Sequence, residues 1–275
     1  MIELNNYRKG FVPKHPFNDI NGEITDHQNR YSQNGEEGVL EKIFGILNIT
    51  NGVFVNAGCD DIHDHSNVRR LISSYGWNKG LFIEPNTTYL NKGIKDIQSD
   101  KRIPNNPTFH FHNGYISVNQ DNESISNIIN QYYKSGFPFD LVTLHIDSYE
   151  YWVLQDFLKS DFNTNVVLIG YNSSLTKCIT APKNCKPKLS HISIYDNFYS
   201  SSALAINKLM KNNNYELVSI CKPNNLIYIT KELNKNNHGE KLFEIYDELT
   251  PEDYYYEVKK GHGLREHIKE GWIEV

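Results

Sequence analysis

The chain has 275 residues, of which 22% are charged and 12% aromatic, and its formal net charge is −5. This length suits one α/β domain with elaborations, and the acidic balance, without a long Lys/Arg cluster, argues against nucleic acid as a partner. No stretch approaches the roughly 18 apolar residues of a membrane span, and the start MIELNNYRKGF lacks the apolar region of a signal peptide. We therefore expect no membrane span and a cytoplasmic protein. Its four cysteines do not make a disulfide framework, which favours free thiols, with a bridge between Cys178 and Cys185 as the alternative.

The chain divides into three expected units. Residues 1–30 are polar and show no sustained period, which predicts an arm that wraps the domain. Ser32 then lies where an N-cap residue is expected, and apolar residues between 39 and 47 recur at helical spacing. We expect one domain at 31–235 and a tail at 236–275 that packs on the same domain.

The segment that follows predicts a strand, a turn, a helix and a second strand. Val53 to Val55 form an apolar run, followed by Asn56 and by Gly58, where a tight turn requires a residue without Cβ. A helix then ends at Gly76, and Glu84 closes the next apolar strand. Because open α/β sheets bind ligands at the carboxyl ends of their strands, we expect the binding site at these two strand ends.

The acid at the second strand end indicates the class of ligand. In α/β nucleotide folds an acid at the position of Glu84 holds the ribose hydroxyls, which predicts an adenosine compound. The three-glycine pyrophosphate fingerprint is missing, since Cys59 and Asp61 occupy positions where small residues would let the backbone approach phosphate. Asp60 and Asp61 suit a cationic or uncharged ligand, and S-adenosylmethionine fits that description.

The later chain continues to alternate helices and strands and closes on a hairpin, which predicts a mostly parallel sheet with an antiparallel end. The long segment 176–198 is predicted to be a functional or mobile loop. The tail at 240–275 is predicted to be a surface helix, with a lid or an oligomer contact as alternatives. The predicted helices lie at 89–97, 125–132, 152–157 and 203–209, and the predicted strands at 108–116, 139–146, 166–169, 215–221 and 226–230.

Several short motifs occur along the chain: SQNGEEG at 32–38, NAGCDD at 56–61, Ser66-Asn67, Gly76-Trp77, Ile83-Glu84-Pro85 and HIDSYEYW at 145–152. In this order they resemble the FkbM-like group of S-adenosylmethionine-dependent methyltransferases, over about 31–233. The resemblance implies a Rossmann-like, seven-stranded class I methyltransferase sheet with helices on both faces, plus an N-terminal arm and a C-terminal helical tail. It also implies S-adenosylmethionine as cofactor and S-adenosylhomocysteine as product.

The donor site expected from the strand ends and from this resemblance comprises eight residues. Simple helix capping is the alternative role for Ser32 and Gln33, and for Glu36 beside them. The expected cofactor-binding residues are Ser32, Gln33, Asn56, Gly58, Asp60, Asn67, Glu84 and Asn113.

Methyl transfer to a hydroxyl acceptor needs a base as well as alignment of donor and nucleophile. His145 and Asp147 lie two residues apart at the end of the strand predicted at 139–146, which places them on one face. Imidazole changes charge between about pH 5 and 8, so His145 is the predicted base and Asp147 orients it or holds the acceptor. The alternative is that His145 is an ordinary strand-end residue and that Asp147 caps the next helix. Glu150 is predicted to be structural or supporting.

Two positions depart from the resembled family. Its members usually carry an acid where His145 stands, and they tend to end the fifth strand Glu-Tyr-Asn, where this chain has Gly170-Tyr171-Asn172. The loss of both acids implies either a different acceptor or lost catalysis.

Histidine pairs with two-residue spacing raise a metal hypothesis, because such residues share a strand face. The pairs are His63 with His65 and His110 with His112, without a closed ligand set. Asp147 and Glu150 are the candidates for Mg²⁺, since hard cations prefer oxygen.

Three functions are consistent with these features. The first is an O-methyltransferase acting on a small polar acceptor, with a sugar, nucleotide-sugar or glycan hydroxyl implied by the family resemblance. The second is a catalytically inactive relative that serves as a binding or assembly module. The third, another nucleotide-dependent enzyme such as a dehydrogenase, is disfavoured by the missing glycine fingerprint. The expected partner is a small molecule or glycan, and a homo-oligomer is left open.

Overall fold

The computed structural model describes residues 30–103, 106–119, 122–183, 200–236, 238–255 and 271–275. Its centre is a seven-stranded sheet with the order β3-β2-β1-β4-β5-β8-β7, in which β8 runs antiparallel to both of its neighbours and the other pairs are parallel. This confirms the predicted α/β sheet with an antiparallel end. The strands are β1 (Val53–Ala57), β2 (Lys79–Ile83), β3 (Thr108–His112), β4 (Pro138–Leu144), β5 (Asn163–Gly170), β7 (Tyr215–Cys221) and β8 (Asn225–Thr230).

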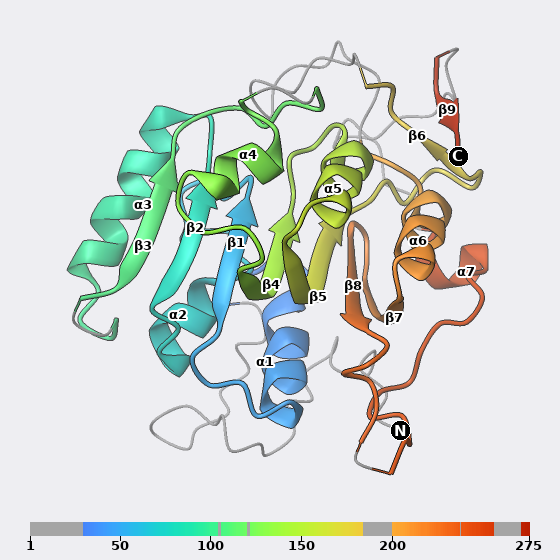
Figure 1. The fold of residues 1–275 in the computed structure, drawn as a ribbon, viewed down its shortest axis with the longest axis horizontal. Coiled ribbons are helices and arrows are strands. Elements are labelled where there is room, and N and C mark those ends of the chain that lie inside the picture. Colours follow the sequence, from blue (N-terminus) through green and yellow to red (C-terminus); the bar gives the residue numbers. More distant parts are fainter. Residues whose placement is uncertain (1–29, 104–105, 120–121, 184–199, 237, 256–270) are drawn as a thin grey trace.

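Helices cover both faces of this sheet (Figure 1). One apolar cluster joins one sheet face to α1, α2 and α3, and a second joins the opposite face to α4, α5 and α6. The fold is therefore the three-layered arrangement that the alternating pattern predicts. The helices are α1 (Glu36–Ile46), α2 (Arg69–Tyr75), α3 (Thr87–Ser99), α4 (Ile125–Asn130), α5 (Glu150–Lys159), α6 (Ala203–Asn212) and the short α7 (Pro251–Tyr254).

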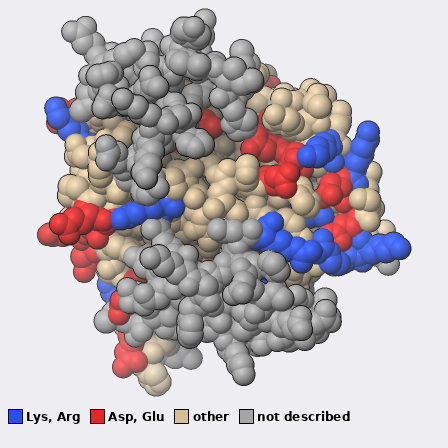
Figure 2. All heavy atoms as spheres, turned by 180° about the vertical axis from the view of Figure 1, so that it is seen from behind, with Lys and Arg blue, Asp and Glu red and all other residues tan. Residues whose placement is uncertain are grey.

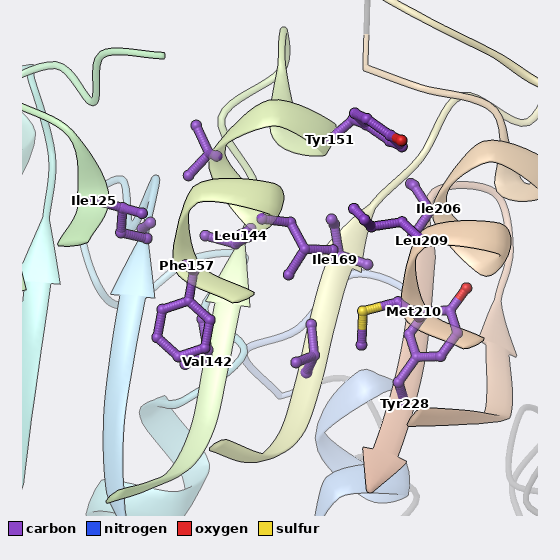
Figure 3. Packing of buried hydrophobic residues seen from close by; sticks show 14 of the residues in the cluster. Ile125, Val142, Leu144, Tyr151, Phe157, Ile169, Ile206, Leu209, Met210 and Tyr228 are labelled. Carbon is purple, nitrogen blue, oxygen red and sulfur yellow. The ribbon is translucent and has the colours of Figure 1, made fainter. Parts of the chain in front are cut away.

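The central strands are apolar at consecutive positions because helices cover them on both sides. In β5, Val166 and Leu168 belong to the cluster under α1 to α3, while Val167 and Ile169 belong to the cluster under α4 to α6. Figure 3 shows this second cluster, where Ile169 lies near side chains of α5 and α6. This packing fixes the register of the strands and with it the relative heights of their carboxyl ends.

Local sequence signals account for several helix ends. The Asn86 side chain accepts hydrogen bonds from the backbone N–H groups of Thr88 and Tyr89 at the start of α3. Ser202 caps α6 by accepting from Ala205 N–H. Gly76 ends α2 with φ 72°, which confirms the predicted glycine C-cap.

Two predicted strands are shorter than their sequence patterns. β3 ends at His112, not at residue 116, because its partner β2 ends at Ile83, the register partner of His112. β4 ends at Leu144, not at residue 146, because a side chain takes the N–H of Ile146 out of the sheet.

The later segments also differ from the prediction. Within the predicted loop 176–198, β6 (Ile179–Thr180) pairs antiparallel with β9 (Ile273–Glu274), and residues 184–198 lie outside the described part. In the described parts of the predicted helical tail, the helix is the four-residue α7. The predicted arm covers residues 1–30, of which 1–29 lie outside the description, and the domain bounds stay predictions.

Cys59, Cys178 and Cys221 are free thiols, and Cys185 lies outside the described residues. Within the described ranges, none of the helices combines the length and apolar character needed to cross a bilayer.

Candidate functional site

The carboxyl ends of β1, β2 and β4 meet at one edge of the sheet, where the tight turn after β1 begins at Gly58. This glycine has φ 73°, and its N–H donates to the carbonyl oxygen of Ile83 at 3.0 Å. A Cβ on Gly58 would stand 2.0 Å from the carbonyl oxygen of His145. The predicted need for glycine in this tight turn is confirmed, because the left-handed φ and the backbone after β4 both exclude a side chain.

Glu84 ties this turn to the start of α3. The residue is 5% exposed, its Oε2 accepts from Asp60 N–H at 3.0 Å, and its Oε1 accepts from Asn86 N–H at 2.8 Å. Asp60 itself has φ 47°, a conformation that needs support in a residue with a side chain. Glu84 therefore braces the turn after β1 in addition to the ribose-binding role predicted for it.

Asn113 fixes the loop that carries Glu84. Its Nδ2 donates to the carbonyl oxygens of Glu84 and Pro85 at 2.8 and 3.1 Å, and its Oδ1 accepts from the Thr87 hydroxyl at 2.8 Å. The nitrogen and the oxygen of the Asn113 side-chain amide therefore both bind the loop. Asn113 thus joins the predicted donor residues as a support of Glu84, and contact with the donor stays a prediction.

The remaining predicted donor residues lie in three places. Asn56 is buried between β1 and β4, where its Oδ1 accepts from the Thr143 hydroxyl at 2.6 Å. Asn67 is buried just before α2. Ser32 Oγ accepts from Glu37 N–H at 3.3 Å, but the N-cap residue of α1 is Gly35 and not Ser32 as expected, while Gln33 is exposed. Donor binding by these four residues stays a prediction.

A buried polar cluster at the start of α1 was missed by the sequence reasoning. Glu36 is fully buried and its Oε1 accepts from the side-chain amides of Asn34 and Asn225 at 2.9 and 2.7 Å. The Asn34 amide also donates to Asn224 Oδ1 at 2.8 Å. Since Asn225 pairs with Gly170 across β8 and β5, this cluster lies at the same sheet edge.

The structure brings the predicted base His145 close to its predicted partner Asp147, but it does so through a turn rather than through a strand. The N–H of His145 donates to the carbonyl oxygen of Ala57 at 3.0 Å, and its Nε2 lies 3.7 Å from Asp147 Oδ1. Because β4 ends at Leu144 and Asp147 has φ 59°, strand alternation is the wrong reason for their proximity. The two side chains are 21% and 29% exposed, so both are accessible to an acceptor.

Glu150 lies buried beneath this turn at the first position of α5. Its Oε1 accepts from the N–H of Ile146 at 3.2 Å, and its Oε2 has no hydrogen-bond partner within the described ranges. Burial raises the pKa of Glu150 to about 7, and the nearby Asp147 carboxylate adds to the rise, while His145 and Ser200 oppose it. A buried, incompletely paired carboxyl group next to two accessible polar side chains is typical of functional sites.

The two positions that depart from the resembled family lie next to each other. A Cβ on Gly170 would stand 3.0 Å from Cδ2 of the His145 ring and 3.6 Å from Glu150 Oε1. A separation of 3.0 Å is tighter than most carbon contacts, so the imidazole would have to shift by a few tenths of an ångström to admit a side chain at position 170. The exchange at 145 and the exchange at 170 are therefore physically coupled.

One histidine of each pair has a polar partner other than a metal. His112 lies 3.4 Å from the Tyr132 hydroxyl and 3.3 Å from Glu123 Oε2, and the His63 ring lies 2.9 Å from Asp64. In the described part of the chain, three or more His, Cys, Asp or Glu side chains never gather in a way that could hold a metal. The hypothesis of Mg²⁺ at Asp147 and Glu150 is therefore not supported.

Charged side chains of both signs are interspersed over the described surface drawn in Figure 2. Lys and Arg lie beside Asp and Glu on this face. This pattern gives the described part of that face no extended field of one sign.

No protein-family model matches the chain, and no curated protein matches it. Among solved structures it is similar to magnesium protoporphyrin IX methyltransferase from Synechocystis PCC 6803 with bound SAM, at 12% identity and a TM-score of 0.44, covering 71% of this chain and 77% of that one. It is also similar to TrmK from M. capricolum in complex with S-adenosyl-homocysteine, at 12% identity and a TM-score of 0.38, covering 74% and 71%. A third similar structure is the small RNA methyltransferase HEN1, at 13% identity and a TM-score of 0.42, covering 75% of this chain and 26% of that one. The assignment of the fold rests on the strand order itself.

Proposed function

We propose that the chain is an S-adenosylmethionine-dependent O-methyltransferase that acts on a small polar acceptor, a sugar, nucleotide-sugar or glycan hydroxyl. The observation that carries this proposal is the direct contact between the turn after β1 and the turn after β4. His145 N–H donates to Ala57 O at 3.0 Å, and the His145 carbonyl lies against Gly58. The predicted donor turn and the predicted base thus share one backbone junction.

The residues at this junction suit an uncharged or cationic adenosine ligand. The acid Glu84 ends β2 beside the Gly58 turn, as expected for an adenosine ribose, and Asp60 adds a second carboxylate next to it. Glu84, Asp60 and the backbone of Gly58 would hold the cofactor. When bound, S-adenosylmethionine supplies an electrophilic methyl group on a sulfonium.

On the acceptor side, His145 takes the proton of the attacking hydroxyl. The separation of 3.7 Å between its Nε2 and Asp147 Oδ1 is too long for a hydrogen bond but within ion-pair range. Asp147 therefore stabilises the imidazolium that forms when His145 accepts the proton. Because both side chains are partly exposed while Glu150 is buried, the acceptor meets His145 and Asp147 first.

The second candidate function is a catalytically inactive binding or assembly module, motivated by the missing acids at 145 and 170. The position of the His145 ring favours the first candidate, because a group able to act as a base stands beside position 170.

The test is formation of S-adenosylhomocysteine when the protein is incubated with S-adenosylmethionine and a panel of sugars and nucleotide sugars. We expect turnover with at least one acceptor and its loss in His145→Ala. Donor binding without turnover on any acceptor of the panel would favour the binding module. Turnover only with acceptors of another class would retain methyl transfer and reject the sugar assignment.

A further inference from the structure

The turn between β4 and α5 has an unusual backbone for the place where a predicted base is presented. Asp147 adopts a left-handed conformation, with φ 59°, although it is not glycine. Such a conformation costs about 1 to 2 kcal/mol in a residue with a side chain. A turn of this kind persists only where its surroundings hold it in place.

The described contacts of this turn come from two sides. On the β1 side, the N–H of His145 donates to Ala57 O at 3.0 Å. One residue later, the N–H of Ile146 leaves the sheet and donates to Glu150 Oε1 at 3.2 Å. The Glu150 carboxyl group thus supplies the hydrogen-bond acceptor at the point where the strand pairing of β4 stops.

The surroundings of Glu150 are closed to solvent and hold few titratable groups. Glu150 is fully buried, and Gly170 of β5 lies beside its Oε1. The Ser200 hydroxyl donates to the carbonyl oxygen of Gly170 at 3.0 Å. The charged or titratable groups that face Glu150 are His145 and Asp147, both from the turn itself.

We propose that Glu150 is a positioning residue, whose buried carboxyl group fixes the backbone at Ile146 and thereby sets the placement of His145 relative to Asp147. The physical reason is that its Oε1 replaces the missing strand partner of Ile146 at the residue between the two side chains. Its Oε2 makes no hydrogen bond within the described ranges, a cost that packing alone does not explain. The roles of His145 and Asp147 rest on the proposed function, but the structural part of this inference does not.

A matched control exists at the other end of the same strand. Asp140 Oδ2 accepts from the N–H of Val53 at 2.8 Å, so it makes the same kind of carboxylate-to-backbone bond far from His145. The experiment measures amide hydrogen exchange of Ile146 and Val53 by NMR in Glu150→Ala, Glu150→Gln and Asp140→Ala. The imidazole resonances of His145, identified by comparison with His145→Gln, are recorded in the same samples.

We expect Glu150→Ala to speed exchange at Ile146 by about tenfold, the effect of one lost hydrogen bond, and to shift the His145 resonances. Glu150→Gln keeps an acceptor oxygen and should restore both. Asp140→Ala should speed exchange at Val53 alone. Affinity for S-adenosylmethionine should change less than about threefold in the Glu150 variants, because Glu150 does not lie at the Glu84 turn.

Unchanged exchange at Ile146 and unchanged His145 resonances in Glu150→Ala would overturn the proposal. If Glu150→Ala does not fold, Glu150→Gln and Glu150→Asp decide: the glutamine variant should match the native protein, and the shorter aspartate should not. Equal exchange rates and equal His145 resonances in these two variants would show that Glu150 does not position this turn. If the native protein binds no S-adenosylmethionine, the proposed function is wrong. The exchange rates still test the positioning role of Glu150 in that case.

Discussion

A buried or half-buried carboxyl group lies near each end of β4, and the two groups differ in how completely their oxygens are hydrogen-bonded. At the amino end, Asp140 has both oxygens paired, one with the N–H of Val53 at 2.8 Å and one with the Asn165 amide at 3.0 Å. At the carboxyl end, Glu150 has one oxygen bound to Ile146 and one without a partner in the described residues. The same strand is thus completed at one end and left incompletely paired at the other.

This difference separates residues that hold the fold from residues that hold a site. A fully paired carboxylate lowers the free energy of the folded state, whereas a buried carboxyl group with an unpaired oxygen costs free energy. Proteins accumulate such costs where geometry serves a ligand or a reaction. The carboxyl end of β4, with Asp147 in a left-handed conformation beside His145, fits that description.

The largest expected effect is on stability. It distinguishes two glycines that lie near the ends of β4 and both have a left-handed backbone conformation. Gly58→Val places a Cβ 2.0 Å from His145 O at φ 73°, so we expect a loss of more than about 4 kcal/mol in the free energy of unfolding, or no folded protein. Gly136 has φ 77° but open space around its Cβ position, so Gly136→Val should lose only about 1 to 2 kcal/mol. Urea titration measures both, and equal losses would show that the contact with His145 does not matter.

The next effect concerns catalysis at the carboxyl end. If His145 accepts the acceptor proton, His145→Ala should lower kcat by about 10² to 10⁴ while donor affinity is retained, as measured by turnover and calorimetry. Unimpaired turnover by His145→Ala would transfer the base assignment to Asp147.

Gly170→Ala provides the control for this assignment, because its Cβ would stand 3.0 Å from the His145 ring, which must shift by a few tenths of an ångström to admit it. It should slow the native enzyme and add little further loss in the His145→Ala background. Additive losses would separate the two positions.

A smaller effect is expected for the donor. Glu84→Ala should weaken S-adenosylmethionine binding about tenfold or more, since a hydrogen bond to a charged group contributes about 1.5 to 3 kcal/mol. Asp140→Ala is the control, because Asp140 is the paired carboxylate of the opposite edge. Equal affinity of folded Glu84→Ala and native protein would exclude the predicted ribose contact.

A further effect is on the pH dependence of stability. Burial raises the pKa of both Glu150 and Glu37 from 4.5 to about 7, so the folded state binds more protons than the unfolded state between these values. The free energy of unfolding should therefore fall as pH rises from about 4.5 towards 7 and above. Glu150→Gln should make this fall shallower and leave the part due to Glu37. Thermal melts between pH 5 and 8 measure the slope, and an unchanged slope would mean that Glu150 titrates normally.

The sequence predicted the features that depend on periodicity and on single turn residues. The apolar runs at 53–55, 80–83 and 166–169 predicted buried strands, and Gly76 and Gly58 were placed in tight turns that the structure contains. The position of Glu84 at the end of β2 followed from the same pattern.

The features that depend on contacts between residues far apart in the sequence could not be predicted from it. The bond between Glu36 and Asn225 joins residues 189 positions apart, and no local pattern signals it. The end of β4 depends on Glu150 reaching back to Ile146, which looks in sequence like a strand running into a helix. The end of β3 depends on the length of β2, not on its own alternating residues.

The most direct test of the central claim is calorimetry of the native protein with S-adenosylmethionine, S-adenosylhomocysteine and NAD. If the edge formed by Gly58, Glu84 and His145 is a methyl-donor site, the protein should bind the first two and not NAD, and Glu84→Ala should weaken both. Binding of NAD without S-adenosylmethionine, or binding of neither, would contradict the account.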